Sequence, residues 1–217
     1  MYIGHYGISL ALKRYNKNLS LGWLFIGTQL VDIIFYVLVL LGIEKMTIIE
    51  NYTASTHFRL DYIPYTHGLL STFIWGTLSY LFVYIISSKN KVSALLIASV
   101  VTSHWGLDLL VHTKDLPLWN NESVKFGFGL WNNSILTFLL EAFILLVGLL
   151  IYLKSTKPLN KFGTYGMFLF SIILIAINTI NIFGPLTDDN IVIFSLISLL
   201  LYILFAIVSF WLDKKRI

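Results

Sequence analysis

Three side chains that can bind a metal or transfer protons recur at four-residue spacing in one apolar segment. The sequence SHWGLDLLVH places His104, Asp108 and His112 at positions i, i+4 and i+8. Because successive residues of an α-helix are rotated by about 100°, neighbouring members of this set are offset by only ~40° and form one polar stripe. Imidazole and carboxylate are common ligands of zinc and similar metals. The spacing therefore predicts a helix with a metal-binding or proton-transferring face.

The helix that carries this stripe begins near Val92 and is long and apolar enough to cross a bilayer. Ionisable side chains at membrane depth are costly, so they usually face the interior of a bundle and mark a site. Other apolar segments are interrupted in the same way, by Asp32 in GTQLVDIIFYV, His67 in PYTHGLL and Glu141 in FLLEAF. We expect these side chains to face the same interior.

The composition is that of a multi-pass membrane protein. The 217 residues are 57% hydrophobic and 12% charged, with a mean hydropathy of +0.81, which is far from a soluble composition. The net charge of +4 does not indicate nucleic-acid binding, because most basic residues lie in short clusters between apolar stretches, where they orient helices. The absence of cysteine from the sequence excludes disulfides, Cys-ligated zinc and thiol catalysis.

Six apolar stretches are long enough to span a bilayer, which predicts an all-α, polytopic bundle in a single integral membrane domain, 1–217. The stretches lie near residues 19–42, 66–86, 92–112, 131–153, 163–183 and 191–212. The segment Ile3–Tyr15 is too short to span and is expected to form a half-helix. This half-helix either lies in the interface as an amphipathic helix or enters the bundle. Entry would bring His5 to the depth of Asp32 and His104.

Basic residues alternate between the ends of the expected spans. Eleven of the 15 lie before the first span, in the second–third and fourth–fifth connections, or after the sixth span: Lys13, Arg14, Lys17, Lys89, Lys91, Lys154, Lys157, Lys161, Lys214, Lys215 and Arg216. Cytoplasmic connections of membrane proteins carry an excess of such residues. We therefore expect both termini to be cytoplasmic and the loops 43–65 and 113–130 to face outside.

The expected site combines metal ligands with carboxylates that could act on water. The candidate metal ligands are His5, Asp32, His67, His104 and Asp108. Glu141 and Asp32 are the candidate catalytic carboxylates, and His112 and Asn132 are possible second-layer residues. A bound metal lowers the pKa of water toward ~7, and Glu141 could orient or deprotonate that water.

Each of these residues also has a structural interpretation. Asp32 could pair with a neighbouring helix, His67 and His112 could be interfacial, and Asn132 could cap the fourth span. His57 lies in a polar outer loop and is not expected to take part. The sequence contains no Gly-rich phosphate loop, no GxSxG motif and no HExxH motif.

The motifs of the first 120 residues resemble a family of inner-membrane-associated, metal-dependent hydrolases of the LexA-binding type. The resemblance rests on IGHYGISLALKR with its early histidine, the Asp32 region, YTHGLL, and SHWGLDLLVHTKDLP. It implies a hydrolase of the bacterial inner membrane with His5, Asp32, His67, His104 and Asp108 as site residues.

Two motifs depart from that family's pattern. The family's acidic motif commonly reads DxDH, whereas only Asp32 stands in QLVDII. Its HRGxTHS motif is matched here with Tyr62 at the first histidine and Gly68 at the serine. These departures favour one metal ion over two.

We therefore expect a membrane-embedded hydrolase that uses one divalent metal, zinc before others, on a lipid or lipid-linked ester or phosphoester. The alternative is a proton-coupled permease with a relay of Asp32, His104, Asp108 and Glu141. A non-catalytic membrane scaffold is the third interpretation. The sequence predicts membrane lipids, and no nucleic acid, as partners.

Overall fold

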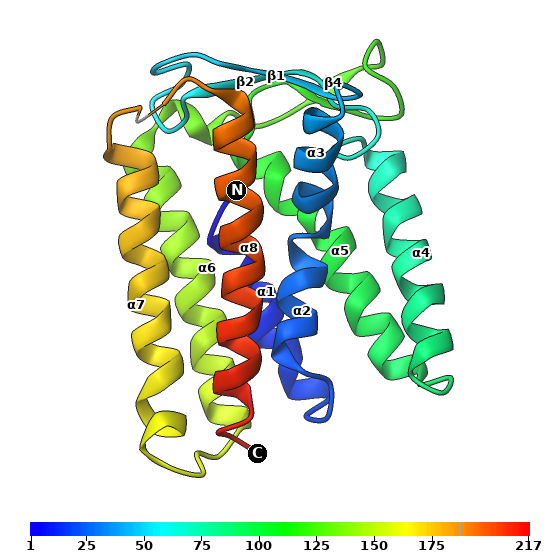
Figure 1. Ribbon diagram of the computed structural model, residues 1–217, viewed down its shortest axis with the longest axis vertical. Coiled ribbons are helices and arrows are strands. Elements are labelled where there is room, and N and C mark those ends of the chain that lie inside the picture. The colour runs from blue at the N-terminus through cyan, green and yellow to red at the C-terminus, as the bar shows by residue number, and fades with distance from the viewer. Residues whose placement is uncertain (187) are drawn as a thin grey trace.

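The computed structural model describes residues 1–186 and 188–217, and within them eight α-helices form a bundle with two short hairpins at one end (Figure 1). The helices are α1 (Gly4–Leu12), α2 (Leu21–Thr28), α3 (Leu30–Leu40), α4 (Leu69–Ile86), α5 (Lys91–Val111), α6 (Ser134–Ser155), α7 (Lys161–Phe183) and α8 (Ile191–Asp213). Five of them, α4 to α8, are each long and apolar enough to cross a membrane, and the bent pair α2–α3 would make a sixth span. The predicted all-α membrane fold is confirmed.

Asparagine side chains start four of the long helices. Asn90, Asn133, Asn160 and Asn190 each accept a hydrogen bond from a backbone N–H in the first turn of the helix that follows. Such a cap satisfies one of the N–H groups that a helix leaves free at its start. The sequence therefore fixes the starts of α5, α6, α7 and α8 locally.

The first predicted span is broken rather than continuous. α2 and α3 are bent by 51° at Gln29, whose backbone leaves the helical region. The Thr28 carbonyl accepts a hydrogen bond from His104, and the Thr28 hydroxyl donates to the His5 carbonyl. A kink of this size has a local cause. Here the carbonyl and the hydroxyl of Thr28, the residue before the break, bond to other helices.

The half-helix α1 enters the bundle. Its residues His5, Tyr6 and Leu10 are fully buried, and α1 lies along α6, with further contacts to α2 and α5. A short 3-10 turn, η1 (Lys13–Tyr15), then leads to α2. The interfacial alternative is therefore wrong, because α1 is apolar around most of its surface and is enclosed by other helices.

Glycines allow α1 and α6 to approach closely. A methyl group added at Gly148 would lie 2.0 Å from the Gly7 carbonyl oxygen, and one added at Gly7 would lie 2.3 Å from the Ile144 carbonyl oxygen. Small residues at such contacts let the backbones of membrane helices meet. The position of His5 inside the bundle thus depends on two glycines.

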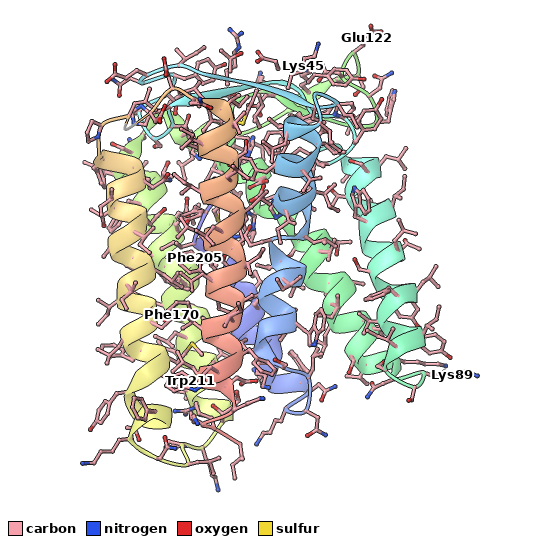
Figure 2. All side chains as sticks on the ribbon, viewed as in Figure 1. Lys45, Lys89, Glu122, Phe170, Phe205 and Trp211 are labelled. Atoms are coloured by element: carbon pink, nitrogen blue, oxygen red, sulfur yellow. The ribbon has the colours of Figure 1, made fainter. Side chains whose placement is uncertain are left out.

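An ion pair joins helices at the end of the bundle where the basic clusters lie (the basic end). The buried Lys13 ammonium lies 2.6 Å from Asp213, and Asp213 also accepts hydrogen bonds from the Leu21 N–H and the Tyr152 hydroxyl. These contacts join η1, α2, α6 and α8. Lys89 lies at this end of the bundle, away from Lys45 and Glu122 (Figure 2). Met1 lies inside the bundle, not at the basic end.

The loops at the other end contain short strands. β1 (Lys45–Ile48) pairs antiparallel with β2 (Phe58–Tyr62), and β3 (Leu116–Pro117) pairs with β4 (Lys125–Phe126). A second 3-10 turn, η2 (Leu130–Asn132), precedes α6. These segments cover the end of the bundle that lacks the basic clusters (Figure 1).

Replacing Gly148 should displace α1. We expect Gly148→Ala to lower the free energy of unfolding by about 1–3 kcal/mol, because the methyl group has no room against Gly7. The matched control is Gly106→Ala in α5, where nothing lies within 4 Å and which should be neutral or stabilising. Thermal unfolding in detergent measures both; equal melting temperatures for the two variants would contradict the close contact.

Single cysteines test the orientation, because the chain has none of its own. Leu159→Cys lies at the basic end and Asn120→Cys at the hairpin end, and both positions are exposed. If the basic end is cytoplasmic, an impermeant maleimide added to intact cells labels Asn120→Cys only. Labelling of Leu159→Cys alone would reverse the orientation.

Candidate functional site

Six ionisable side chains from four parts of the chain meet inside the bundle. His5 comes from α1, Asp32 from α3 just after the break, and His67 from the segment before α4, while α5 contributes His104 and Asp108 and is followed directly by His112, whose extended backbone ends the helix. All are nearly inaccessible to solvent except Asp32, whose side chain is 13% exposed. The five predicted metal ligands and the predicted second-layer residue His112 thus lie together.

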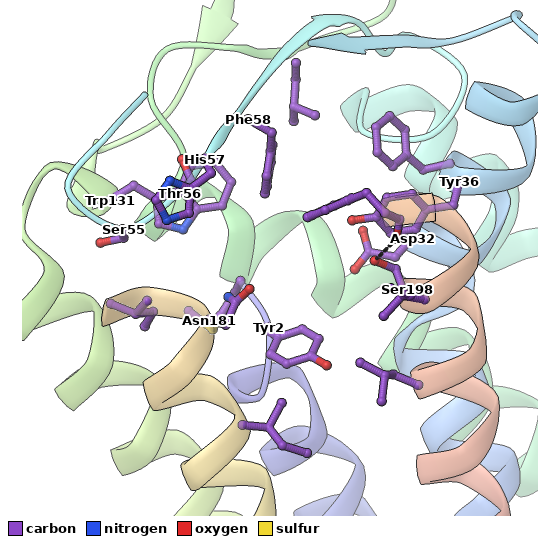
Figure 3. Close-up of a pocket in the computed structure, with 18 of the residues that line it drawn as sticks. Tyr2, Asp32, Tyr36, Ser55, Thr56, His57, Phe58, Trp131, Asn181 and Ser198 are labelled. Carbon is purple, nitrogen blue, oxygen red and sulfur yellow. Dashed lines mark hydrogen bonds between the residues drawn. The ribbon is translucent and has the colours of Figure 1, made fainter. Parts of the chain in front are cut away.

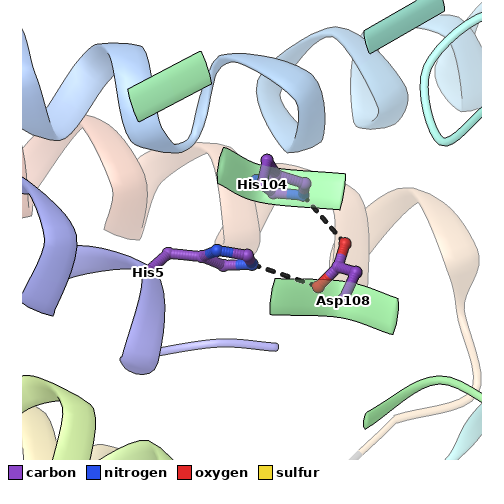
Figure 4. A group of neighbouring side chains, drawn as sticks. All are labelled: His5, His104 and Asp108. Carbon is purple, nitrogen blue, oxygen red and sulfur yellow. Dashed lines mark hydrogen bonds and ion pairs between the residues drawn. The ribbon is translucent and has the colours of Figure 1, made fainter. Parts of the chain in front are cut away.

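Asp108 is at the centre of the cluster. The Nε2 atoms of His5 and His104 lie 3.1 Å from its Oδ1 and Oδ2, respectively, and these two rings stack with centroids 4.0 Å apart (Figure 4). His112 Nε2 lies 3.6 Å from Oδ2. The Met1 amino nitrogen lies 2.5 Å from Oδ1. Four nitrogen atoms therefore surround one buried carboxylate.

Asp32 extends this arrangement. Its Oδ1 lies 3.2 Å from His67 Nε2 and 3.4 Å from His104 Nε2, and His67 Nε2 is 3.9 Å from Asp108 Oδ2. Four atoms that tetrahedrally ligate a zinc ion at 2.0–2.1 Å are about 3.3 Å apart. The separations from His104 Nε2 to the two carboxylates and from His67 Nε2 to Asp32 are therefore close to those that such an ion requires.

Three histidines are oriented by acceptors on their other ring nitrogen. His104 Nδ1 lies 2.9 Å from the Thr28 carbonyl and His112 Nδ1 lies 3.0 Å from Asp115 Oδ1. A carbonyl oxygen and an ionised carboxylate can only accept hydrogen bonds, so each Nδ1 donates. In a neutral ring this leaves the Nε2 lone pair directed at the carboxylates. Metal-binding histidines commonly have this second hydrogen bond.

His67 is oriented through Thr66 and Glu44. His67 Nδ1 is 2.8 Å from the Thr66 hydroxyl, which is 2.6 Å from Glu44 Oε2. An ionised Glu44 only accepts, so Thr66 donates to it and accepts the Nδ1–H of His67. Burial raises the pKa of the Glu44 carboxyl, while hydrogen bonds from Thr66 and Tyr65 oppose that shift.

Two ring nitrogens of the cluster are left without an ordinary hydrogen bond. Among the described residues, His104 Nε2 and His5 Nδ1 are buried and have no hydrogen-bond partner. His104 Nε2 nevertheless lies near two carboxylate oxygens. A neutral ring would direct a lone pair at negative charge, which is unfavourable, so an imidazolium or a metal ion would satisfy this arrangement, in addition to the Met1 ammonium beside Asp108 Oδ1. The donor set of imidazole and carboxylate fits a divalent metal.

In the described part of the chain, two triads could hold an ion, with ligand atoms within 4.8 Å of one another: His5, His104 and Asp108, and Asp32, His67 and His104. Both include His104. An ion bound by one triad would therefore use a ligand of the other.

Glu141 and Asn132 occupy different environments. Glu141 is buried, and its Oε2 accepts hydrogen bonds from the N–H groups of Tyr2 and Gly4 at the start of α1. It therefore holds the segment that carries His5. Asn132 is exposed on η2, because Asn133 rather than Asn132 caps α6. Its placement in the second layer of the site is not supported by this position.

A cavity of about 340 Å³ reaches the cluster. Asp32, His67, Asp108, His112 and Glu141 lie on its wall. Figure 3 shows Asp32, Tyr2 and Asn181 around it, with Ser55 to Phe58 on the side of the hairpins. Pockets that bind small molecules usually have volumes from about 300 Å³ upward.

Several residues of the site were not predicted from the sequence. Thr28, Glu44 and Asp115 orient histidines, and Tyr202 donates to Asp32 Oδ2 over 3.2 Å. Thr66 was within the recognised YTHGLL motif. His57 was assigned to a loop without function, but it lines the cavity and its Nε2 lies 3.2 Å from the Gly184 carbonyl at the end of α7.

Comparisons of the chain with protein-family models, with curated proteins and with solved structures give no match.

Removal of a ligand should remove the metal. We expect wild-type protein purified without chelator to carry about one divalent ion per chain. His104→Ala and Asp108→Ala should lose this ion, because each substitution removes a candidate ligand that lies close to several others in the cluster. His57→Ala and Asn132→Ala are the controls and should keep it. Elemental analysis by mass spectrometry measures all five proteins. An equal metal content in all of them would refute the ligand assignment.

The partners of His67 should tune affinity. Glu44→Gln can donate from its amide to Thr66, which then donates to His67 Nδ1 and shifts the ring proton to Nε2. We expect zinc affinity, measured by chelator competition, to fall about 10–100-fold, as for other second-layer changes. Glu122→Gln, on an exposed outer loop residue, should leave it unchanged. A similar affinity in both variants would contradict this orientation.

Proposed function

We propose that this protein is a metal-dependent hydrolase embedded in the bacterial inner membrane, acting on a lipid or lipid-linked ester or phosphoester. The single observation that carries the proposal is the convergence of four histidine Nε2 atoms on Asp32 and Asp108 at the wall of a cavity. The motif resemblance to membrane metal-dependent hydrolases supports the same chemistry.

Zinc is the ion that this ligand set favours, and the shared ligand His104 favours one ion over two. When bound, such an ion lowers the pKa of a coordinated water and stabilises negative charge on a phosphoryl or carbonyl oxygen. His104 would hold it, together with His5 and Asp108 or with Asp32 and His67. Second-layer bonds from Thr28, Thr66 and Asp115 keep three of the imidazoles in the tautomer that can ligate.

Two carboxylates can handle protons beside the ion. Glu141 lies on the cavity wall and accepts the backbone N–H groups of Tyr2 and Gly4 at Oε2. Asp32 holds one oxygen toward the histidines and the other toward the Tyr202 hydroxyl. We assign Glu141 as the base that accepts a proton from water, and Asp32 as a ligand that also faces substrate.

Two substitutions of Glu141 separate its proposed role as a base from its role as an acceptor for the N–H groups at the start of α1. Glu141→Gln keeps an oxygen that accepts the N–H groups of Tyr2 and Gly4, so metal content and melting temperature should remain near wild type while turnover falls ~10²–10⁴-fold. Glu141→Ala loses the cap as well and should also lose stability. Turnover is measured by mass spectrometry of products from phospholipids and lipid-linked phosphates, with and without chelator.

Full activity in Glu141→Gln would exclude the base role. No metal-dependent product from any lipid, together with ion flux in vesicles that Glu141→Gln abolishes, would instead support the permease alternative.

A further inference from the structure

The cavity at the metal cluster extends sideways between α7 and α8. Its wall includes Ile177 and Ile180 from α7 and Ile193, Ile197 and Leu201 from α8. Three of these residues are also exposed on the outer surface of the bundle: Ile180 by 69%, Ile193 by 41% and Ile197 by 52%. The same side chains thus border both the cavity and the lipid-facing surface, so the cavity opens laterally.

The packing of the two helices explains where this opening lies. Near the basic end α7 and α8 are in close contact: the rings of Phe162 and Trp211 are 5.5 Å apart, and a methyl group at Gly166 would meet Leu212 at 2.5 Å. Toward the hairpin end the cavity lies between them. α8 packs mainly along α2 and α3, whereas α7 packs along α6, so the two helices belong to different sides of the bundle.

The opening joins an apolar wall to a polar end. Ser198 and Tyr202 lie one turn apart on α8, and Tyr202 donates to Asp32. Asn181 lies across the cavity on α7 (Figure 3). Apolar side chains therefore border the opening, with the exposed amide of Asn181 beside them, and the buried Tyr202 hydroxyl leads inward to the carboxylates and histidines. This order matches a molecule with a hydrocarbon chain and a polar head.

The volume limits how much of such a molecule is enclosed. About 340 Å³ is near the lower limit for a small-molecule site, enough for a head group and the first part of a chain. The rest of the chain must then remain in the bilayer. An amphiphile from the membrane meets this condition, whereas a fully water-soluble ligand would leave the isoleucine wall without a partner.

We propose that the opening between the outer halves of α7 and α8 is a lateral binding site for a membrane phospholipid, whose chain lies against the isoleucines and whose phosphate faces the cluster. The position of the phosphate rests on the proposed metal site, because Asp32, Asp108 and Glu141 without a cation would repel it. The position of the chain does not depend on the metal.

Tryptophan substitutions test the lateral site. Leu201→Trp and Ile177→Trp add bulk to the cavity wall from either helix, and Leu200→Trp, on the next residue of α8, which is 65% exposed, is the matched control. Detergent-purified proteins are incubated with phosphatidylglycerol vesicles, repurified and analysed for bound lipid by native mass spectrometry. Zinc content is measured on the same samples.

We expect wild type and Leu200→Trp to retain phosphatidylglycerol, and Leu201→Trp and Ile177→Trp to bind it about tenfold more weakly, a loss of about 1.4 kcal/mol, with zinc unchanged. If Leu201→Trp does not fold, Ile177→Trp decides. The lateral site would be overturned, with the metal site left intact, by either of two results. The folded cavity variants could bind as much phosphatidylglycerol as wild type, or Leu200→Trp could lose as much of it as they do. If wild-type protein contains no zinc, while Leu201→Trp still binds less phosphatidylglycerol than Leu200→Trp, only the metal site would be overturned.

Discussion

The burial of two carboxylates, Asp32 and Asp108, is the constraint around which this bundle is organised. Taking an ionised carboxylate out of water costs several kcal/mol unless charges and hydrogen bonds compensate. Four histidines, a tyrosine hydroxyl and the Met1 amino group lie against these two groups. Each of these partners must be brought to the centre of an apolar bundle, and that requirement accounts for the irregular parts of the fold.

Two departures from regular helices meet this requirement. The break at Gln29 frees the Thr28 carbonyl to orient His104 and places Asp32 in the first turn of α3. The half-helix α1 brings His5 inward, held by the Gly7–Gly148 contact, by Glu141 at its start and by Lys13 with Asp213 at its end. Broken and re-entrant helices inside a membrane protein are tolerated where protein surrounds them. Here they also bring His5 and Asp32 to the candidate metal site.

The sequence predicted those parts of the structure that depend on local pattern. The length of the apolar stretches predicted the spans, and the four-residue spacing of His104 and Asp108 predicted one face of α5, whereas His112 lies just after the helix ends. The bend at Gln29 was missed, since the segment is hydrophobic enough overall to be one span and the cause of the bend lies in contacts with α1 and α5. Glu44 and Thr28 were missed for the same reason. Two adjacent asparagines precede α6, and only the structure shows that Asn133 caps the helix while Asn132 is exposed.

The histidines of the cluster could ligate a metal or only neutralise two carboxylates. X-ray absorption at the zinc edge distinguishes these two roles most directly, on zinc-loaded wild-type protein and His67→Ala. If the histidines ligate zinc, we expect nitrogen and oxygen neighbours at about 2.0–2.1 Å, with outer-shell scattering from imidazole rings that weakens in His67→Ala. A spectrum of hydrated zinc without imidazole scattering, or one unchanged by His67→Ala, would contradict ligation by the histidines.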